Sequence, residues 1–174
     1  MAKKTISNEF MQNIVTEEAW KELSENFNWS ESLLEKYQDK LDWSLVSGNN
    51  NIRWTIPMIE KFQKKLDWDK LSETLDEEEL TESMIETFKN KWNWHELSGN
   101  GFFKLTHELL EKYADQWDWE RIIDRYGRNI YDDNGIDFYE RYKDYIPVSK
   151  LQGTNLWREI IGQEKKQLIE TIIA

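Results

Sequence analysis

Apolar residues recur along most of the chain in one repeated pattern. A Ser or Thr is followed by large apolar residues three, four, seven and eleven positions later. These offsets place the apolar side chains on one face of an α-helix. The pattern begins at Ser30, Thr55, Thr81 and Thr106, with starts 25 or 26 residues apart. It therefore predicts a row of similar helices, each of which buries one face.

Each of these helices carries signals for its start. The Ser or Thr can accept hydrogen bonds from the free N–H groups of the first turn. A large apolar residue precedes each cap and can pack on the residue four positions after it, which fixes the angle at which the chain enters the helix. These preceding residues are Trp29, Trp54, Leu80 and Leu105.

A second, shorter helix is predicted after each of the first ones. Every copy ends in Asp-Trp or Asn-Trp, at positions 42–43, 67–68, 93–94 and 118–119, with an aliphatic residue three positions after the Trp. The Asp or Asn suits a helix N-cap. Gly48-Asn49 and Gly99-Asn100 then predict helix ends in the left-handed conformation.

The two ends of the chain depart from this pattern. We expect Ser7 to cap a first helix, and Thr16 to cap a short second one with Trp20 and Leu23. A degenerate fifth copy places Gly135 at the cap position, after an inserted loop at residues 124–134. We expect Thr154 to cap a final helix, and Gly162 to break that helix in two.

The sequence thus predicts an all-α fold, a solenoid of five to six helix-pair repeats of about 25 residues with an atypical C-terminal capping helix. We expect a single elongated domain over residues 1–174, with a regular array at 1–123, a degenerate repeat at 124–151 and a cap at 152–174. A leucine-rich repeat is the alternative, because its period overlaps. The Trp-x-x-Leu-Ser segments have helical spacing rather than the strand pattern which that repeat needs.

The repeated pattern, from about Trp20 to Ile123 and more weakly to Leu151, resembles the tryptophan-rich tandem helical repeats of uncharacterised bacterial, phage and large-virus proteins. Trp54-Thr55-Ile56-Pro57-Met58-Ile59-Glu60-Lys61-Phe62 and Asp67-Trp68 carry the resemblance. It implies a scaffold and no particular chemistry.

Composition narrows the class of protein. Ten Trp and 14% aromatic residues are far too many for a disordered chain, and the absence of Cys excludes disulfides, thiolate zinc sites and cysteine nucleophiles. The N-terminal residues lack the apolar segment of a signal peptide, and no apolar run is long enough to span a membrane. We therefore expect a cytoplasmic protein.

The net charge of −11 lies entirely in residues 1–120, while the remainder is neutral. An acidic surface argues against direct binding of nucleic acid or of an anionic membrane, and permits a basic protein partner.

The Trp side chains have two interpretations. They either form a stacking platform for bases or sugars, or they fill the core, which their fixed place in each repeat favours. We expect Trp29 and Trp54 to be the most exposed. His95 and His107 could ligate a metal only if the fold brought them together. The chain also lacks the common phosphate-loop and hydrolase motifs. We expect no metal, no cofactor and no catalytic residues.

Two surface regions are candidates for binding a partner. One is an acidic run with more carboxylates than helix capping needs: Glu73, Asp76, Glu77, Glu78 and Glu79. The other lies on and beside the inserted loop and holds Arg and Tyr, the residues typical of interface hot spots: Arg121, Arg125, Tyr126, Arg128 and Tyr131.

The sequence therefore favours a non-catalytic protein-interaction module. One alternative is an acidic inhibitor or decoy, such as one encoded by a phage against host defence, which occupies the basic site of a nucleic-acid-binding protein. An enzyme of unrecognised type is the second alternative.

Overall fold

The structure is a computed structural model that describes residues 8–127 and 129–173. Over these residues the chain forms twelve α-helices and no strand, which confirms the predicted all-α class. The chain divides into two compact units, Met1–Thr74 and Leu75–Ala174, where the sequence predicted a single domain. Within the described residues, no helix has both the length and the apolar character needed to cross a membrane.

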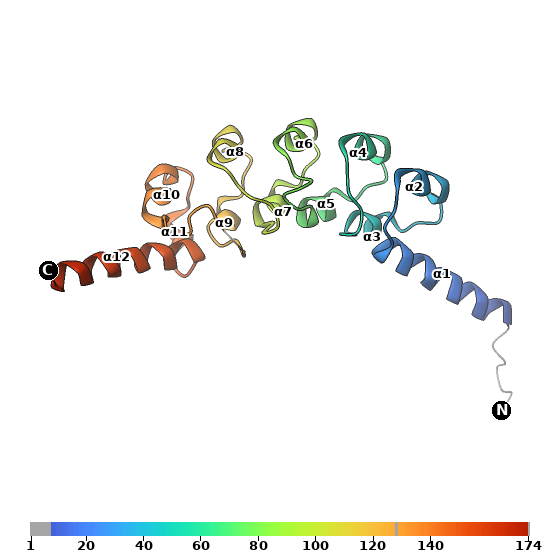
Figure 1. Ribbon diagram of the computed structural model, residues 1–174, viewed down its shortest axis with the longest axis horizontal. Helices are drawn as coiled ribbons and strands as arrows, with labels where there is room; N and C mark the ends of the chain where they lie inside the picture. Colours follow the sequence, from blue (N-terminus) through green and yellow to red (C-terminus); the bar gives the residue numbers. More distant parts are fainter. Residues whose placement is uncertain (1–7, 128, 174) are drawn as a thin grey trace, which may run out of the picture. The chain divides into compact units, whose positions relative to one another are not determined.

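The first unit places its helices in two rows (Figure 1). Its helices are α1 (Asn8–Asn26), α2 (Glu31–Tyr37), α3 (Trp43–Ser47), α4 (Ile56–Phe62) and α5 (Trp68–Thr74). The first helices of the pairs, α2 and α4, form one row, and the second helices, α3 and α5, form the other. In this second row α1 packs on α3, and α3 packs on α5.

The second unit repeats this plan (Figure 1). Its first helices are α6 (Glu82–Thr87), α8 (His107–Lys112) and α10 (Gly135–Tyr142). Its second helices are α7 (Trp94–Gly99), α9 (Trp119–Ile122) and α11 (Val148–Leu151), and the chain continues into α12 (Asn155–Ile173). Helix α7 packs on α9, and α10 packs on α12.

The predicted caps of the first helices are confirmed. Ser30, Thr55, Thr81 and Thr106 each accept a hydrogen bond from the N–H three residues later, at 3.2–3.4 Å. The second helices α3, α5, α7 and α9 are capped in the same way by the side chains of Asp42, Asp67, Asn93 and Asp118. These polar side chains therefore set where each helix begins.

The first helices are shorter than the apolar pattern indicated. Helix α2 ends at Tyr37, so Leu41, at offset eleven, lies in the following turn, although it is still buried. The indole Nε1–H of Trp43 donates to the carbonyl of Gln38 at 2.8 Å. Equivalent bonds from Trp68, Trp94 and Trp119 measure 3.2, 3.1 and 2.9 Å. The tryptophan that begins α3, α5, α7 or α9 thus satisfies a carbonyl just beyond the end of the preceding first helix.

A serine four residues after the tryptophan connects successive helix pairs within each unit. Ser47 Oγ donates to the carbonyl of Trp43 at 2.6 Å and accepts from the N–H of Asp67 at 2.9 Å. In the second unit, Ser98 Oγ accepts from the N–H of Asp118 at the same distance. A buried hydroxyl therefore joins the end of one second helix to the start of the next.

The Gly-Asn segments do not end helices in the left-handed conformation, so that prediction is wrong. Gly48 has φ −91° and Asn100 has φ −66°. Asn49 instead connects its loop to the preceding helix: its buried Nδ2 group donates to the carbonyls of Ser24 and Phe27, at 3.0 and 2.9 Å. Asn100 likewise donates to the carbonyl of Leu75 at 2.8 Å. Each asparagine joins its loop to the preceding repeat.

The N-terminal helix is continuous, so the predicted cap at Thr16 is wrong. Helix α1 runs from Asn8 to Asn26, and the hydroxyl of Thr16 donates to the carbonyl of Gln12, four residues earlier, at 2.7 Å. Such a bond lets a threonine remain inside a helix. The predicted cap at Ser7 lies outside the described residues.

At the C-terminal end one predicted cap is confirmed and two predictions are wrong. Thr154 Oγ1 accepts from the N–H of Trp157 at 3.2 Å. Asn134, rather than Gly135, occupies the N-cap of α10, because Gly135 lies in the first turn against α12, where a Cβ would come within 2.9 Å of Glu159 Cβ. Gly162 does not break α12, because a glycine lowers helix stability by only about 1 kcal/mol.

Trp29 and Trp54 were expected to be the most exposed tryptophans, and this prediction is also wrong. Both are 4% exposed, and the indole of Trp29 donates to the carbonyl of Leu23 at 2.9 Å. The tryptophans that begin α3, α5 and α7 are only half-buried. The residues that precede the caps are therefore core residues.

Tyr142 and His107 link α8 to α10. His107 Nδ1 lies 2.7 Å from the Tyr142 hydroxyl, and the two rings stack at 5.8 Å. Burial, together with the nearby Arg141 guanidinium, holds the pKa of His107 below its usual 6.5. The folded chain thus favours neutral His107, whereas the unfolded chain binds a proton near pH 6.5.

We therefore expect the free energy of unfolding to be constant above pH 6.5 with respect to this group, and to fall as the pH drops below 6.5. The slope for one proton is at most about 1.4 kcal/mol per pH unit. His107→Gln should flatten the profile between pH 6.5 and 5.5, as measured by urea unfolding. An unchanged slope in the variant would assign the pH dependence to other groups.

Candidate interaction site

Two loops of the second unit are held together, backbone against backbone, and we call residues 100–103 and 125–127 the paired loops. A Cβ added to Gly101 would lie 2.4 Å from the carbonyl oxygen of Tyr126. A Cβ on Gly127, where φ is +91°, would lie 3.1 Å from the carbonyl oxygen of Gly101. Glycine at both positions is what allows the two backbones to approach so closely.

Arg125 locks the paired loops from the inside. The residue is 2% exposed, and its guanidinium donates to the carbonyls of Asn100 and Phe103, the latter at 2.9 Å. It also lies 5.2 Å from the centre of the Phe103 ring. Burial lowers the pKa of Arg125 to about 10, which leaves it charged at neutral pH. The prediction that Arg125 contacts a partner is therefore corrected, because its side chain is internal.

Two aromatic side chains of the paired loops stand in solvent. Tyr126 is 86% exposed and Phe102 is 66% exposed, whereas the neighbouring Phe103 is 2% exposed. Tyr126 was predicted from the sequence, and Phe102 was missed. The sequence feature that could have identified Phe102 is a departure from the repeat, because the equivalent position in the earlier copy is the exposed Asn51.

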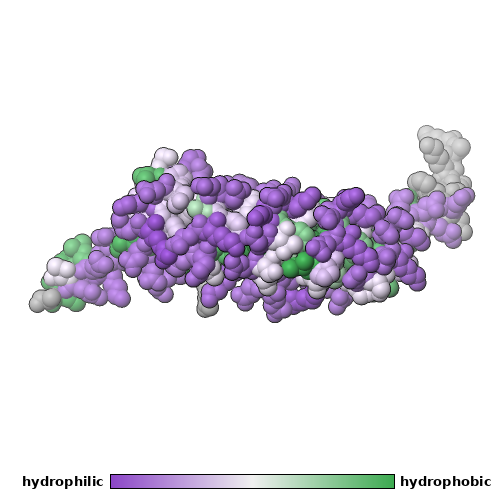
Figure 2. Space-filling view, turned by 90° about the horizontal axis from the view of Figure 1, so that it is seen from above, coloured by the Kyte–Doolittle hydropathy of each residue, from purple (hydrophilic) through white to green (hydrophobic). Residues whose placement is uncertain are grey.

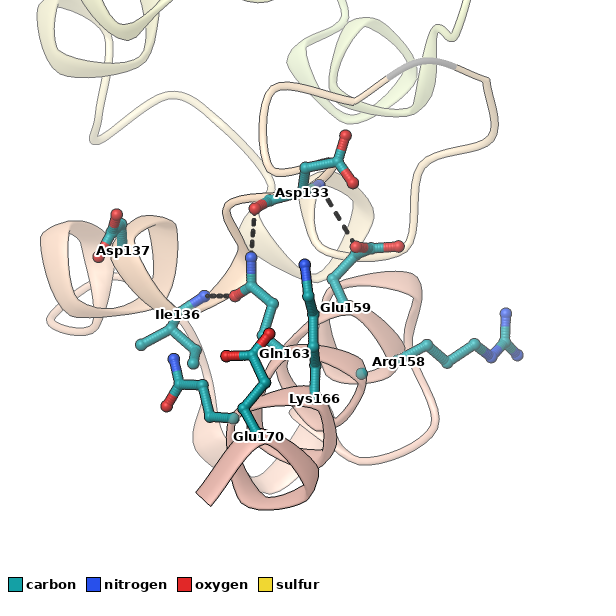
Figure 3. A pocket seen from close by; sticks show the side chains of 10 residues that line it. Asp133, Ile136, Asp137, Arg158, Glu159, Gln163, Lys166 and Glu170 are labelled. Atoms are coloured by element: carbon teal, nitrogen blue, oxygen red, sulfur yellow. Dashed lines mark hydrogen bonds between the residues drawn. The ribbon is translucent and has the colours of Figure 1, made fainter. Parts of the chain in front are cut away.

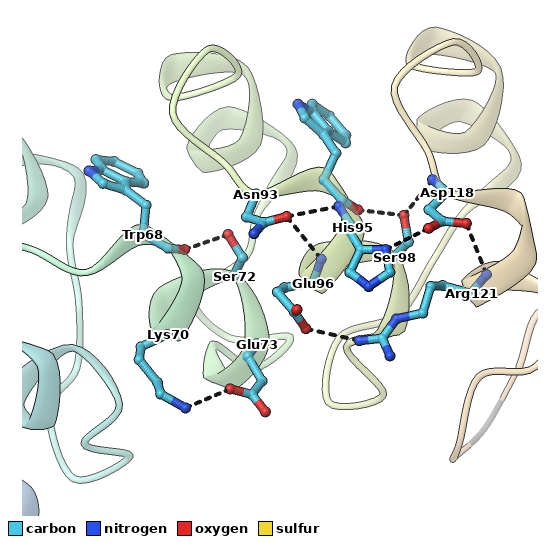
Figure 4. Close-up of polar contacts among 11 residues, drawn as sticks. Trp68, Lys70, Ser72, Glu73, Asn93, His95, Glu96, Ser98, Asp118 and Arg121 are labelled. Carbon is cyan, nitrogen blue, oxygen red and sulfur yellow. Dashed lines mark hydrogen bonds and ion pairs between the residues drawn. The ribbon is translucent and has the colours of Figure 1, made fainter.

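A hollow of about 320 Å³ lies beside Tyr126. It is lined by His95, Gly99, Asp118, Glu120, Arg121, Asp124, Arg125 and Tyr126. His95 Nδ1 lies 2.6 Å from Asp118 Oδ2, and Arg121 Nη2 lies 2.9 Å from Glu96 Oε2 (Figure 4). These contacts bridge α7 and α9, and the Glu96 carboxylate neutralises the cation of Arg121. The hollow is therefore lined by the carboxylates of Asp118, Glu120 and Asp124, by the cations of Arg121 and Arg125, and by the Tyr126 ring.

The acidic run is divided between the two units. Glu73 belongs to the first unit and forms an ion pair with Lys70 at 3.0 Å (Figure 4). Asp76 belongs to the second, and its carboxylate accepts from the N–H of Glu78 at 2.9 Å. Glu77 and Glu78 are exposed, and Glu79 is half-buried. Glu73 and Asp76 therefore also have local roles within their own units.

The remaining residues of the predicted site lie elsewhere. Tyr131 is 1% exposed, and its ring packs edge-on against Phe138 at 5.2 Å. The prediction that Tyr131 contacts a partner is therefore corrected, because the core of the second unit needs its ring. Arg128 lies outside the described residues. Of the predicted cluster, the structure leaves Arg121 and Tyr126 exposed beside the hollow.

The two histidines do not form a pair, because His95 contacts Asp118 and His107 contacts Tyr142. Within residues 8–127 and 129–173, no group of three or more His, Asp or Glu side chains could hold a metal ion. The carboxylate of Asp118 also caps α9, accepting from the N–H groups of Glu120 and Arg121. The polar groups at the site are thus engaged in structural contacts.

Comparison with protein-family models, with curated proteins and with solved structures finds no match to this chain.

Replacing Arg125 with methionine should lower the free energy of unfolding of the second unit by about 2–4 kcal/mol, because two buried carbonyls lose their donor. The matched control is Arg121→Met, whose exposed ion pair is worth about 1 kcal/mol or less. Urea unfolding measures both. An Arg125→Met variant as stable as the parent would show that burying the charge costs as much as its hydrogen bonds contribute.

Proposed function

We propose that the protein is a non-catalytic protein-interaction module built on a helical-repeat solenoid. The repeated contacts within each unit support the scaffold: the same caps, the same indole bonds and the same serine and asparagine links recur from pair to pair. The resemblance to tryptophan-rich tandem helical repeats agrees with a scaffold and adds no chemistry.

The observation that carries the proposal is the exposure of Phe102 and Tyr126 on locked loops. Large aromatic side chains in solvent are unfavourable in a free protein and are typical anchors of interfaces. The close approach of Gly101 to Gly127 and the bonds from Arg125 hold both loops in place before binding. Such preorganisation strengthens binding, because little loop entropy is lost in the complex.

The surroundings of Tyr126 favour a partner with a basic surface. The hollow beside it is lined by the carboxylates of Asp118, Glu120 and Asp124, and the chain carries a net charge of −11. A Lys or Arg side chain of the partner can enter this hollow and pack against the Tyr126 ring. The polar groups of the hollow cap helices and form ion pairs, which agrees with binding rather than catalysis.

The second candidate is an acidic decoy that occupies the basic site of a nucleic-acid-binding protein. The exposed carboxylates of Glu77 and Glu78 favour it. The two candidates use different surfaces, so they are separated by which substitutions abolish binding.

The test uses the full chain, immobilised and exposed to an extract of its source cells. Four baits are compared: the parent, Phe102→Ser with Tyr126→Ser, a reversal of Asp76, Glu77, Glu78 and Glu79 to lysine, and Phe27→Ser as an exposed aromatic control. Captured proteins are quantified at low and high salt. We expect one partner to be retained by the control and by the charge reversal, and to be reduced about tenfold or more by the double variant.

The decoy predicts the reverse pattern. A nucleic-acid-binding protein would be captured by the double variant, lost with the charge reversal, and released at high salt because exposed charges are screened. A specific partner retained equally by all four baits would contradict both surface assignments.

A further inference from the structure

From Ile161 onward, helix α12 carries a stripe of apolar side chains that are exposed to solvent. Its members, Ile161, Leu168 and Ile172, are between 45% and 72% exposed, and Ile169 and Ile173 beside it are 51% and 78% exposed. Figure 2 shows this end of the helix as a hydrophobic region beside a largely hydrophilic surface. Apolar side chains that gather in solvent on one face of a helix mark an interaction surface. The stripe therefore calls for a binding partner.

The stripe points away from the helix on which α12 packs. The side-chain amide of Gln163 accepts from the N–H of Ile136 at 2.9 Å and donates to the carbonyl of Asp133 (Figure 3). At 100° per residue, Ile161, Leu168 and Ile172 lie within about 20° of a common direction, roughly 160° from Gln163. The polar face of α12 thus meets α10, and the apolar face is free.

We propose that this stripe pairs with the same stripe of a second copy of the chain, with the two α12 helices antiparallel. The seam consists of positions 161, 165, 168 and 172, separated by four, three and four residues. This is the spacing of a two-helix coiled coil. Because the order of separations is the same from either end, an antiparallel two-fold pair places Ile161 against Ile172 of the second copy, and Lys165 against its Leu168.

Charge selects the antiparallel orientation. A parallel pair would set Lys165 against Lys165 within the seam, where like charges repel. The antiparallel pair instead sets each Lys165 against Leu168 of the second copy, where its alkyl stem can pack while its ammonium group reaches solvent. The helix also carries three basic and three acidic residues, so two copies do not repel here despite the net charge of −11: Arg158, Lys165, Lys166, Glu159, Glu164 and Glu170.

The same balance argues against a lipid surface as the occupant. Helices that lie on anionic membranes have an excess of Lys and Arg on the polar face. On α12 the face opposite the stripe holds Glu159 and Glu170 as well as Lys166. A chain of charge −11 is repelled by such a surface.

Disulfide trapping tests the register directly, because the chain contains no cysteine. Full-length Ile161→Cys and Ile172→Cys proteins are oxidised alone and as a mixture. We expect the mixture to give the covalent heterodimer at least about tenfold faster than either protein alone, since each residue faces the other only in the antiparallel pair. Gln167→Cys, which lies off the stripe, is the control and should not cross-link faster than by random collision.

Sedimentation equilibrium supplies the second measurement. The parent chain should dimerise with a dissociation constant on the order of micromolar, since so short a pair buries less than a standard interface. Leu168→Lys should weaken the dimer about 100-fold or more, because each dimer loses two buried leucines. Glu170→Lys, on the opposite face, should leave it nearly unchanged.

The remaining outcomes overturn the proposal. Cross-linking of each variant with itself and not in the mixture would indicate a parallel pair. A parent chain that stays monomeric at 100-fold above the expected dissociation constant would exclude the second copy as occupant. Flotation of this monomer with vesicles of phosphatidylcholine and phosphatidylglycerol, lost in Leu168→Lys, would assign the stripe to a lipid surface.

Discussion

Replacing Leu110 with alanine is expected to lower the free energy of unfolding of the second unit by about 3–5 kcal/mol. Leu110 is 0% exposed, and it lies four residues after the cap Thr106, whose carbonyl accepts its N–H at 3.0 Å. Helix α8 has only six residues, so Leu109 and Leu110 supply its buried side chains. Removing one of them takes away much of what holds the helix in place.

The matched control is Leu168→Ala, the same substitution at a side chain that is 59% exposed. We expect a change below about 1 kcal/mol when the protein is diluted below the concentration at which it self-associates. Urea unfolding followed by tryptophan fluorescence measures both variants. A loss below about 1 kcal/mol for Leu110→Ala would mean that the cavity collapses and that α8 is not held by this residue.

The helix starts could be predicted because they depend on neighbours in the sequence. A hydroxyl or carboxylate that accepts from the N–H two or three residues later is a local arrangement, and Thr55 and Asp118 cap as expected. The apolar residues around each cap, such as Trp54 and Leu105, are buried for the same local reason. The apolar position eleven residues after each cap also identified Leu66 and Trp92 as core residues.

The helix ends could not be predicted from the same pattern. An offset of eleven fits a continuing helix, yet Trp92 lies beyond the end of α6 at Thr87. Beyond the helix end, the N–H of Trp92 donates to the carbonyl of Phe88 in a turn, and the indole of Trp94, a later residue, donates to the carbonyl of Lys89. Periodicity shows which side chains are buried and does not distinguish a helix from a helix followed by a turn.

The candidate site was predicted only in part, because residue type does not determine exposure. The sequence indicated Arg125, Tyr126 and Tyr131 equally as candidates for binding a partner. In the structure, Arg125 and Tyr131 are buried and Tyr126 is exposed. The difference arises from contacts across 22 residues or more, such as the bond between Arg125 and the carbonyl of Phe103. Phe102 was missed because residue type alone does not distinguish its exposed ring from the buried ring of the adjacent Phe103.

Gly101→Ala should reduce partner binding strongly without removing any residue that contacts the partner. The added Cβ would lie 2.4 Å from the carbonyl oxygen of Tyr126, so the paired loops must separate. Phe102 and Tyr126 then lose their fixed spacing, and binding loses the advantage of preorganisation. We expect partner binding to weaken about 100-fold and the free energy of unfolding of the second unit to fall by about 1–3 kcal/mol. Titration calorimetry with the identified partner and urea unfolding measure the two effects.

Gly162→Ala is the control, with an expected effect on stability of the opposite sign. Nothing lies within 4 Å of a Cβ at this position, which is inside α12, so alanine should raise the free energy of unfolding by about 0.5–1 kcal/mol. Partner binding should not change, because the paired loops are untouched. If Gly101→Ala lowered stability and left binding intact, the aromatic side chains would act independently of the loop contact, and the rigid two-loop site would be wrong. If it changed neither, the close approach of Gly101 to Gly127 would not exist in solution.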